Sequence, residues 1–384
     1  MTRTRTFGWR TTTAILIGVA LVSVLLIRAT RPTPPYVVGA YYYGWYDSGH
    51  WATFDYLGPR LPEALEPSMG QYHSDDPDVV RTHVRWAGAY AIDFLIVSWY
   101  GQGNTADRQA RNLLLPALAE STVRQAPVIE LLSYGDLDLS NPDLRRRLTT
   151  DLRYVGEHYL RHPSAMRVRG RPLLFLYVTR ELRGDVSGWI ADVRRELRAM
   201  GVDPFIVADE AFWQDVNLER LRPYDAITAY NVYDSSRARL RGWADRSTFF
   251  ADVEGLFAKW RDAARASGAA FIPNIMPGYN DRGVRLEADH FVIPRQMRAD
   301  GPMTGFLERS ISLAKRYTDP GLRMVTITSF NEWHEWTAIE PARRAQRHAP
   351  GPDPSAYTQG FPHPFFEFEY LEMIRDRLHR RPNQ

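Results

Sequence analysis

Two glutamates, Glu332 and Glu335, stand three residues apart directly after a strongly β-forming run near the C-terminus. The surrounding string, residues 326–335, reads TITSFNEWHE, so that an asparagine, a tryptophan and a histidine crowd around the pair. Two carboxyl groups held together among aromatic side chains have their pKa values pushed apart, so that one can act as an acid while the other acts as a base. Such a pair is the minimal equipment for cleaving a glycosidic bond.

The same string has other interpretations. One glutamate can cap the following helix while the other is solvated. His334 can equally be a core histidine that forms hydrogen bonds or a substrate contact. A zinc-protease motif is excluded, because the residue four positions after His334 is Ala338 rather than histidine. The chain contains no cysteine, which also excludes thiol nucleophiles and Cys-ligated zinc. We therefore expect neither a metal nor a cofactor.

Aromatic residues gather at the ends of three further β-like runs, which end in YYYGWYD, SWYG and PGYND. Aromatic rings stack on the C–H faces of sugars while their polar tips bind hydroxyl groups. A single aromatic residue is more often part of a core, but the coincidence at three strand ends favours a sugar-binding cleft. The aromatic residues at these strand ends, Tyr100 among them, are therefore candidate substrate contacts.

These residues need strands to position them, and eight short runs rich in valine, isoleucine and aromatics supply candidates. Most of the runs are continuously apolar, which indicates strands buried on both faces. The expected strands are Val37–Trp45, Phe94–Tyr100, Pro127–Tyr134, Pro172–Val178, Phe205–Asp209, Asp225–Asn231, Phe271–Pro277 and Met324–Asn331.

Segments with helical periodicity lie between these runs. The expected helices are Val79–Tyr90, Arg108–Ala119, Leu144–Tyr159, Val186–Met200, Ala251–Ala266 and Gly305–Tyr317, with a long loop at 340–364 and a closing helix at 365–379.

Eight strands that alternate with helices predict an α/β fold, a single-domain (β/α)8 TIM barrel. The competing fold is a doubly wound open sheet, but no Gly-rich phosphate loop follows the first strand. In a barrel of this kind the catalytic groups lie at the C-terminal ends of the strands, where Glu332 and Glu335 fall.

The N-terminal segment predicts a membrane anchor. Residues 1–10 are a basic head, and residues 11–27 form an uncharged stretch of 17 residues, near the lower limit for spanning a bilayer. A cleaved signal peptide is the alternative, although no small-x-small cleavage site follows the stretch. Residues 28–35 are a Pro-rich spacer, and residues 36–384 are the catalytic domain. The positive-inside rule puts that domain outside the cytoplasm, either anchored or, after cleavage, secreted.

The charge distribution argues against nucleic acid as a partner. The net charge is +3, but residues 1–35 contain five arginines and no acidic residue. The rest of the chain keeps 43 of the 48 basic residues against 45 acidic ones. No basic stripe with interleaved aromatics is present, so we expect no nucleic-acid binding.

With these residues in view, the chain resembles glycoside hydrolase family 99, the endo-α-mannosidases and endo-α-1,2-mannanases, as a distant member. The resemblance runs from about Tyr36 to the last helix. Five pieces carry it in order, and the last is close to diagnostic. They are Tyr41–Tyr46, Met69–Pro77 leading to His83, Val97–Tyr100, Pro277–Tyr279 and Ser329–Glu335.

The resemblance implies a retaining endo-acting hydrolase that cleaves internal α-mannosidic linkages in oligosaccharides or polysaccharides. In the family's mechanism one glutamate deprotonates the sugar's own 2-hydroxyl group, which attacks the anomeric carbon to give a 1,2-anhydro sugar. Matched by position, the resemblance implies that Glu332 is the base and Glu335 is the acid and later the base. It also implies that the cleft is lined by Tyr43, Trp45, Tyr46, Trp99 and Tyr279, with Asn331 and His334 as polar contacts. We also expect a monomer.

The sequence departs from the family pattern in places that affect substrate binding. The family usually continues the last motif with glycine and glutamine, whereas this chain has Trp336 and Ala338. A Glu-Pro-Tyr string at the third strand is replaced by residues 132–134, LSY, and Glu130 is out of register with it. Two alternatives stay open: a glycosyltransferase-associated protein of the same superfamily that makes surface polysaccharide, and a non-catalytic glycan-binding barrel.

Overall fold

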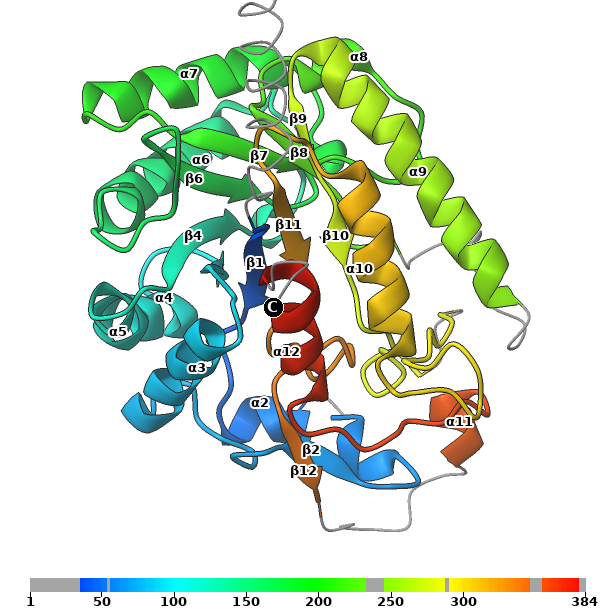
Figure 1. Cartoon of the computed structure of the whole chain (residues 1–384). Coiled ribbons are helices and arrows are strands. Elements are labelled where there is room, and N and C mark those ends of the chain that lie inside the picture. The colour runs from blue at the N-terminus through cyan, green and yellow to red at the C-terminus, as the bar shows by residue number, and fades with distance from the viewer. Residues whose placement is uncertain (1–34, 54–55, 233–244, 287–289, 346–353, 380–384) are drawn as a thin grey trace, which may run out of the picture. The chain divides into compact units, whose positions relative to one another are not determined.

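A closed ring of parallel strands forms the centre of the protein in the computed structural model (Figure 1). The structure describes residues 35–53, 56–232, 245–286, 290–345 and 354–379. The predictions for 1–10, 11–27 and nearly all of 28–35 therefore lie outside the described residues. Within the described residues, no helix is long and apolar enough to cross a membrane.

The strands follow one another round the ring in chain order, and β11 pairs in parallel with β1 to join the last strand to the first. All eight expected strands are present, so the predicted (β/α)8 barrel is confirmed. The seventh strand is in two pieces, β9 and β10. The strands are β1 (Val37–Tyr42), β3 (Phe94–Trp99), β4 (Arg124–Ile129), β6 (Arg171–Leu176), β7 (Phe205–Asp209), β8 (Ala226–Thr228), β9 (Ala270–Ile272), β10 (Asn274–Ile275) and β11 (Met324–Ile327).

The seventh barrel strand is split into β9 and β10 by Pro273, which has no backbone N–H to donate to a neighbouring strand. β9 pairs with β8 on one side, and β10 pairs with β11 on the other, so the two pieces together complete the ring. The third strand differs from the prediction at its end: β4 stops at Ile129, and Leu131–Tyr134 form a short 3-10 helix instead.

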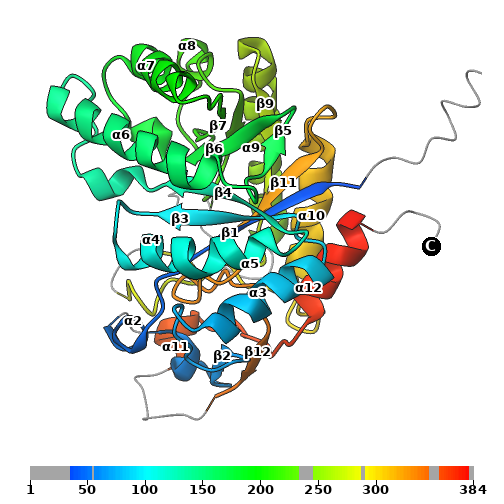
Figure 2. The same ribbon diagram turned by 90° about the vertical axis from the view of Figure 1, so that its left-hand side faces the viewer.

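Helices cover the outside of the ring, as the barrel requires (Figure 2). The Ala110–Leu114 π-turn joins α4 and α5 into one run, and similar turns extend α6 to Leu160 and α12 to His379. The covering helices are α3 (Pro77–Ala89), α4 (Thr105–Gln109), α5 (Leu115–Ala119), α6 (Pro142–Val155), α7 (Val186–Ala199), α8 (Leu218–Leu221), α9 (Asp245–Ser267), α10 (Gly305–Tyr317) and α12 (Glu369–Ile374).

Smaller elements elaborate the loops that follow the strands. The antiparallel pair β2 (Leu65–Pro67) and β12 (Ala342–Arg344) links the loop after β1 to the loop after β11. Residues 340–364 were expected to be a loop throughout, but they contain β12 and α11 (Pro354–Thr358). The remaining short elements are α2 (Ser48–Thr53), β5 (Arg167–Val168) and the 3-10 helices Gly58–Arg60 and Thr179–Glu181.

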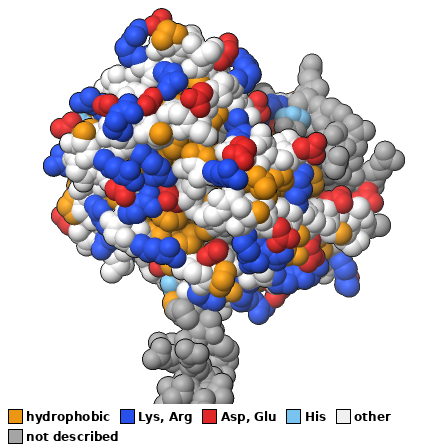
Figure 3. Space-filling model, turned by 90° about the horizontal axis from the view of Figure 1, so that it is seen from above, with side chains coloured by type: hydrophobic (Ala, Val, Ile, Leu, Met, Phe, Trp, Pro, Cys, Tyr) orange, Lys and Arg blue, Asp and Glu red, His pale blue; other side chains and the backbone are white. Residues whose placement is uncertain are grey.

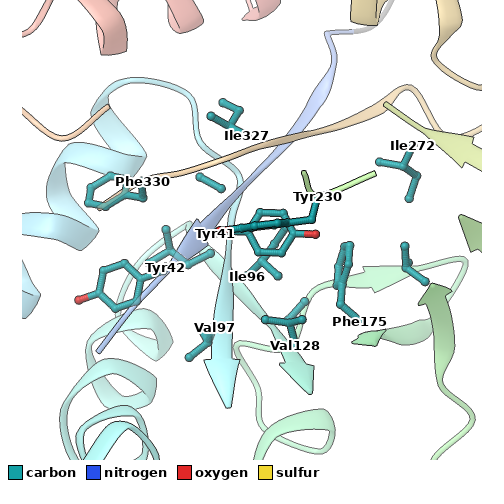
Figure 4. Close-up of a cluster of buried hydrophobic side chains, with 14 of the residues drawn as sticks. Tyr41, Tyr42, Ile96, Val97, Val128, Phe175, Tyr230, Ile272, Ile327 and Phe330 are labelled. Atoms are coloured by element: carbon teal, nitrogen blue, oxygen red, sulfur yellow. The ribbon is translucent and has the colours of Figure 1, made fainter. Parts of the chain in front are cut away.

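The inside of the ring is filled with side chains. Tyr41 of β1 lies edge-on to Tyr230, which follows β8, with ring centroids 4.7 Å apart, and Phe175 of β6 lies beside both (Figure 4). Tyr41 is 2% exposed and Phe175 is 1% exposed. The barrel interior is therefore a packed core, and any substrate must bind at its mouth.

Charged side chains of both signs alternate on the face over α7, α8 and α9 (Figure 3). Ion pairs account for much of this pattern, including those that join Arg145 to Asp192 and Arg198 to Asp203. Such a mixed surface offers no single-sign track for a phosphate backbone on this face.

Candidate active site

The two glutamates lie in a tight turn directly after β11. The backbone N–H of Glu332 donates to Ser329 Oγ at 2.7 Å, and the N–H of His334 donates to Glu332 Oε1 at 2.9 Å. The N–H groups of Thr337 and Ala338 both donate to the Glu332 carbonyl. These bonds fold the chain back on itself and fix the Glu332 carboxylate, which is 4% exposed.

Glu335 is the more exposed carboxyl, with 22% of its side chain accessible. Burial, reinforced by the negative charge of Glu332, raises the pKa of Glu335 to about 8. Arg285 opposes this shift, because its Nη1 lies 3.3 Å from Glu335 Oε1. At neutral pH Glu335 therefore holds a proton, as a general acid must.

A cluster from the loop after β10 supports Glu335. Asp281 is 1% exposed and accepts hydrogen bonds from Arg285 at 2.8 Å, with His290 Nδ1 at 2.5 Å from the same oxygen. The N–H of Asn280 donates to the Glu335 carbonyl. Arg285, His290 and Asp281 were not predicted, because nothing in the spacing of a loop shows that its charged side chains reach back to another strand end.

A third carboxyl group, Glu130, lies at the end of β4. It is 8% exposed, and Ser98 Oγ donates a hydrogen bond to its Oε1. Burial raises the pKa of Glu130 to about 8, and the charges of Asp209, Glu335 and Glu332 add to the effect. Its position directly after an expected strand could have identified Glu130 as a site residue. It was not chosen because it is out of register with the Glu-Pro-Tyr string of the family.

An aromatic group stands beside the Glu332 turn. Trp45 stacks on Tyr43 at 4.4 Å and on His50 at 5.2 Å, and its ring lies 5.5 Å from that of Tyr100. Trp45 and Tyr100 are partly exposed, so both can contact a bound ligand. Burial is the main reason that the pKa of His50 falls to about 4, which leaves this imidazole neutral.

Several predicted contacts are instead buried supports of the turn. Tyr46 OH donates to the Asn331 carbonyl at 2.6 Å and accepts from the Trp333 N–H at 3.1 Å. The Asn331 side chain bonds the backbone of Tyr43 through both its oxygen and its nitrogen, at 2.9 Å each. Asn331 is fully buried and Tyr46 is 1% exposed, so these two residues hold the site rather than line it.

Trp99 also does not line the cleft. It is 1% exposed, and its indole N–H donates to Asp107 at 3.0 Å, inside a hydrogen-bonded cluster behind β3. Tyr279, in contrast, lines the cleft described below. His334 is 5% exposed, with its Nδ1 3.6 Å from Glu332 Oε1, so it contacts the proposed base.

A buried polar network lies behind the turn. His83 Nε2 is 3.0 Å from Glu340 Oε1, and the other Glu340 oxygen accepts from Tyr72 OH and from the Trp333 indole N–H. Tyr42 OH is 3.1 Å from His83 Nδ1. The network ties α3 and β1 to the segment that follows the two glutamates.

A cleft of about 440 Å³ opens beside Glu335, and we call it the Glu335 cleft. It lies among the loops after the third to eighth strands, with Tyr177 and Tyr279 next to the carboxyl group. The rest of its lining includes Leu132, Asp136, Arg180, Glu181, Arg183, Phe212, Asn231, Arg285 and His290. Among the residues that the structure describes, no group of three or more histidines and acids is arranged to hold a metal.

Two family models match this chain in overlapping stretches. The model of glycosyl hydrolase family 99 matches residues 58–199, and the model named glycosyltransferase WbsX matches residues 147–349, just over half of the chain. The second stretch includes both glutamates of the turn.

Several relatives match the chain over most of its length. Glycoprotein endo-alpha-1,2-mannosidase from Mus musculus is 23% identical over 351 residues, which cover 80% of this chain and 69% of the relative. A glycoprotein endo-alpha-1,2-mannosidase-like protein from Homo sapiens is 24% identical over 349 residues, covering 79% of this chain and 68% of the relative.

Solved structures share the fold. The GH99 endo-alpha-mannosidase from Bacteroides thetaiotaomicron matches with a TM-score of 0.64 at 20% identity, covering 88% of this chain and 96% of that one. A glycoside hydrolase-like protein matches with a TM-score of 0.67 at 16% identity, covering 91% and 95%. The chain therefore belongs to the family of the WbsX model and is distantly similar to glycosyl hydrolase family 99.

Proposed function

We propose that this protein is a retaining, endo-acting glycoside hydrolase that cleaves internal α-mannosidic linkages in oligosaccharides or polysaccharides. The observation that carries the proposal is the pair Glu332 and Glu335 in one turn after β11, with the pKa of Glu335 raised to about 8. The endo-alpha-1,2-mannosidases among its relatives support mannose as the substrate sugar.

The proposed reaction starts with proton transfer to Glu332 from the sugar's 2-hydroxyl group. The 2-oxygen attacks the anomeric carbon, and Glu335 gives its proton to the departing oxygen. The product of this step is a 1,2-anhydro sugar. In manno-configured sugars the 2-hydroxyl is axial and trans to an α-linked leaving group, so that it approaches from the back. Water, deprotonated by Glu335, then opens the three-membered ring while Glu332 returns its proton, and two inversions give net retention.

Each carboxyl group has its own test. Glu332→Gln and Glu335→Gln should each abolish cleavage of defined α-mannans, because one variant lacks the base and the other lacks the acid. Circular dichroism should show unchanged folds. Normal cleavage by either variant would contradict the assignment. Proton NMR of the first-formed product should show the α-anomer, and an inverted product would exclude the anhydro-sugar route.

A transferase that builds a surface polysaccharide is the second candidate, and the WbsX family match favours it. The two functions differ in their products. A hydrolase releases a new reducing end in water, whereas a transferase forms a glycosidic bond to an added acceptor. Chromatography of a reaction that contains both glycan and acceptor tells them apart. A catalytically silent glycan-binding barrel would do neither.

We also propose that residues 11–27 anchor the protein in a membrane, with the catalytic domain on the extracytoplasmic side, and that this domain is a monomer. The supporting feature is the uncharged stretch preceded by arginines. Light scattering on the fragment from residue 36 onward tests the monomer, and a mass of two copies would contradict it.

A further inference from the structure

A second hollow lies on the outer wall of the barrel, along the exposed side of α9 (Figure 1). Its volume is about 460 Å³, and we call it the α9 groove. Its described lining is Trp213, from the loop after β7, and Ala251, Asp252, Gly255, Leu256 and Lys259 of α9, none of which lines the Glu335 cleft. We propose that the α9 groove is a second, non-catalytic glycan-binding site that holds an uncharged sugar residue of a polymeric substrate. The proposal rests on the proposed function.

The loop after β7 is fixed to α9 on both sides of Trp213. The indole N–H of Trp260 donates to the Phe212 carbonyl at 2.7 Å, and Lys259 Nζ donates to the Gln214 carbonyl at 2.7 Å. Phe212 lines the Glu335 cleft, whereas Trp213 lines the α9 groove. One short, anchored loop therefore separates the two hollows, and a glycan that leaves the cleft across this loop arrives at the groove.

A glycine in the middle of α9 keeps the groove open. Gly255 is exposed, and a Cβ atom added to it would meet no described atom within 4 Å. A glycine in a helix interior is less favourable than an alanine, and here no neighbouring group needs the space. Ala251, one turn earlier, is also small and exposed. A larger side chain at position 255 would therefore fill the groove without displacing the core.

The side chains around the groove suit an uncharged sugar. Trp213 is partly exposed, and an indole ring can stack on the C–H face of a sugar. Asp252 and Lys259 are both exposed, and a carboxylate accepts hydrogen bonds from hydroxyl groups while an ammonium group donates them. These two charges are of opposite sign, so the described lining has no net charge. A neutral sugar therefore fits it better than a phosphate group or a uronic acid does.

The length of the glycan decides whether the groove matters. One sugar residue stacked on one aromatic ring binds weakly by itself. For a long glycan that the active site already holds, the second contact is intramolecular, and its strength depends on the effective concentration that the connecting sugars set. A substrate of two sugar residues has none left for the groove. The groove should therefore increase the affinity for polymers and have no effect on short substrates.

The test compares an α-mannan polymer with α-mannobiosyl fluoride as substrates of the full chain. Trp213→Ala removes the aromatic surface, and Gly255→Leu fills the groove. Each should raise KM for the mannan roughly two- to tenfold, the contribution of one aromatic contact, and leave kcat unchanged. Neither should change kcat/KM for the fluoride. Ala266→Leu adds the same bulk at an exposed position of α9 outside the groove, so it is the matched control and should change nothing.

The Gly255→Leu result is decisive, because this change adds a side chain to open space and removes no contact of the folded protein. An unchanged KM for the mannan in Gly255→Leu would overturn the proposal. An equal loss on the fluoride substrate would also overturn it, because the effect would then lie in the active site.

A failure of the proposed function is a separate result. If the wild type cleaves neither substrate, the hydrolase assignment fails, and affinity electrophoresis in a gel that contains the α-mannan then tests the groove alone. Slower migration of the wild type than of Gly255→Leu supports the groove as a glycan-binding site. Equal migration of the two proteins overturns it.

Discussion

Glu332 and Glu335 are chemically the same, but their surroundings differ in ways that fit the two roles proposed for them. Glu332 is held by the N–H of His334 inside the turn, whereas Glu335 is partly exposed to the cleft and faces Arg285. Burial and the Glu332 charge outweigh the arginine, so the pKa of Glu335 rises. The proposed acid and base are thus distinguished partly by His334 and Glu332, which lie within the sequence motif, and partly by Arg285, which the motif does not contain.

This difference predicts the alkaline limit of activity. In the proposed mechanism Glu335 must be protonated, so on the alkaline side kcat/KM for a mannoside should fall as the pH rises through about 8. Arg285→Gln removes the cation that holds this pKa down, so the alkaline limb should move to higher pH. The pH profile of kcat/KM measures both. The control is α-mannobiosyl fluoride, a substrate whose fluoride leaving group needs little proton assistance. An alkaline limb of the same size with this fluoride substrate would show that another group titrates.

Glu130 predicts a pH dependence of stability. Its folded-state pKa of about 8 lies above the ordinary 4.5, so the folded protein binds this proton more tightly than the unfolded chain does. The stabilisation is complete below about pH 4.5 and is lost as the pH rises towards 8. Glu130→Gln removes the titration, so its free energy of unfolding should decrease less between pH 5 and 8 than that of the wild type.

Urea unfolding at several pH values measures the two slopes. Glu63→Gln, a change at an exposed surface carboxyl, is the control and should keep the wild-type slope. Parallel slopes for wild type and Glu130→Gln would mean that Glu130 is ionised in the folded state.

Among the individual residues, the sequence predicted the two glutamates and the aromatic character of the site, because apolar patterns show where strands end. It did not predict which aromatics are supports. Like Trp45, both Trp99 and Tyr46 are aromatic residues at the end of an expected strand. Trp99 is buried with its indole N–H donating to Asp107, and Tyr46 is buried with its hydroxyl donating to the Asn331 carbonyl. Those partners depend on how loops fold back, which a local pattern does not encode.

At the scale of elements, the turn after β11 is held from outside by one buried cation. Arg295 is 2% exposed, and its Nη2 donates to the carbonyls of Trp336 at 2.9 Å and Ala338 at 2.7 Å. Its guanidinium lies over the rings of Phe366 and Tyr370 at 4.7 Å each. Arg295 thereby joins the turn to the C-terminal segment around α12 and positions Glu335 without touching it.

Replacement of Arg295 should reduce the rate of mannoside cleavage. Arg295→Met should lower kcat for a mannoside at least tenfold, because the acid is no longer held in place, while the fluoride substrate should react nearly as before. The free energy of unfolding should also fall by roughly 2–3 kcal/mol, the value of hydrogen bonds from a charged donor. Arg295→Lys should recover part of the activity. An equal loss on both substrates would indicate general disruption instead of a misplaced acid.

The elements themselves were largely predictable. Strands buried on both faces are continuously apolar, and helices repeat with a period of 3.6 residues, so both types of element were located. The split at Pro273 and the β2–β12 pair were not located. β2 and β12 have three residues each and owe their existence to a partner far along the chain.

At the scale of the whole molecule, the charge of the chain divides at residue 35. The five arginines before that point account for the net positive charge, and the catalytic region is close to neutral. Three of the five, Arg3, Arg5 and Arg10, precede the uncharged stretch and support the proposed orientation of the anchor, because arginines favour the cytoplasmic side of a spanning segment.

The anchor can be tested in cells. The full chain should sediment with membranes and remain there in 1 M salt, because a spanning stretch is held by apolar burial rather than by charge. In spheroplasts, added protease should degrade the catalytic domain. Deletion of residues 1–35 is the control and should leave the protein in the cytoplasm. A soluble, protease-protected full chain would contradict both the anchor and its orientation.

The closure of the ring by β1 and β11 constrains how the protein is made. Val37 pairs with Met324, so one edge of the first strand has no partner until nearly all of the chain has been synthesised. An unpaired edge strand is a template for association with other chains. Glu332 and Glu335 follow the same closing strand, so a chain that ends before β11 lacks both the β1–β11 pairing and the proposed catalytic pair. Every copy that can act on a glycan has therefore also finished building its barrel.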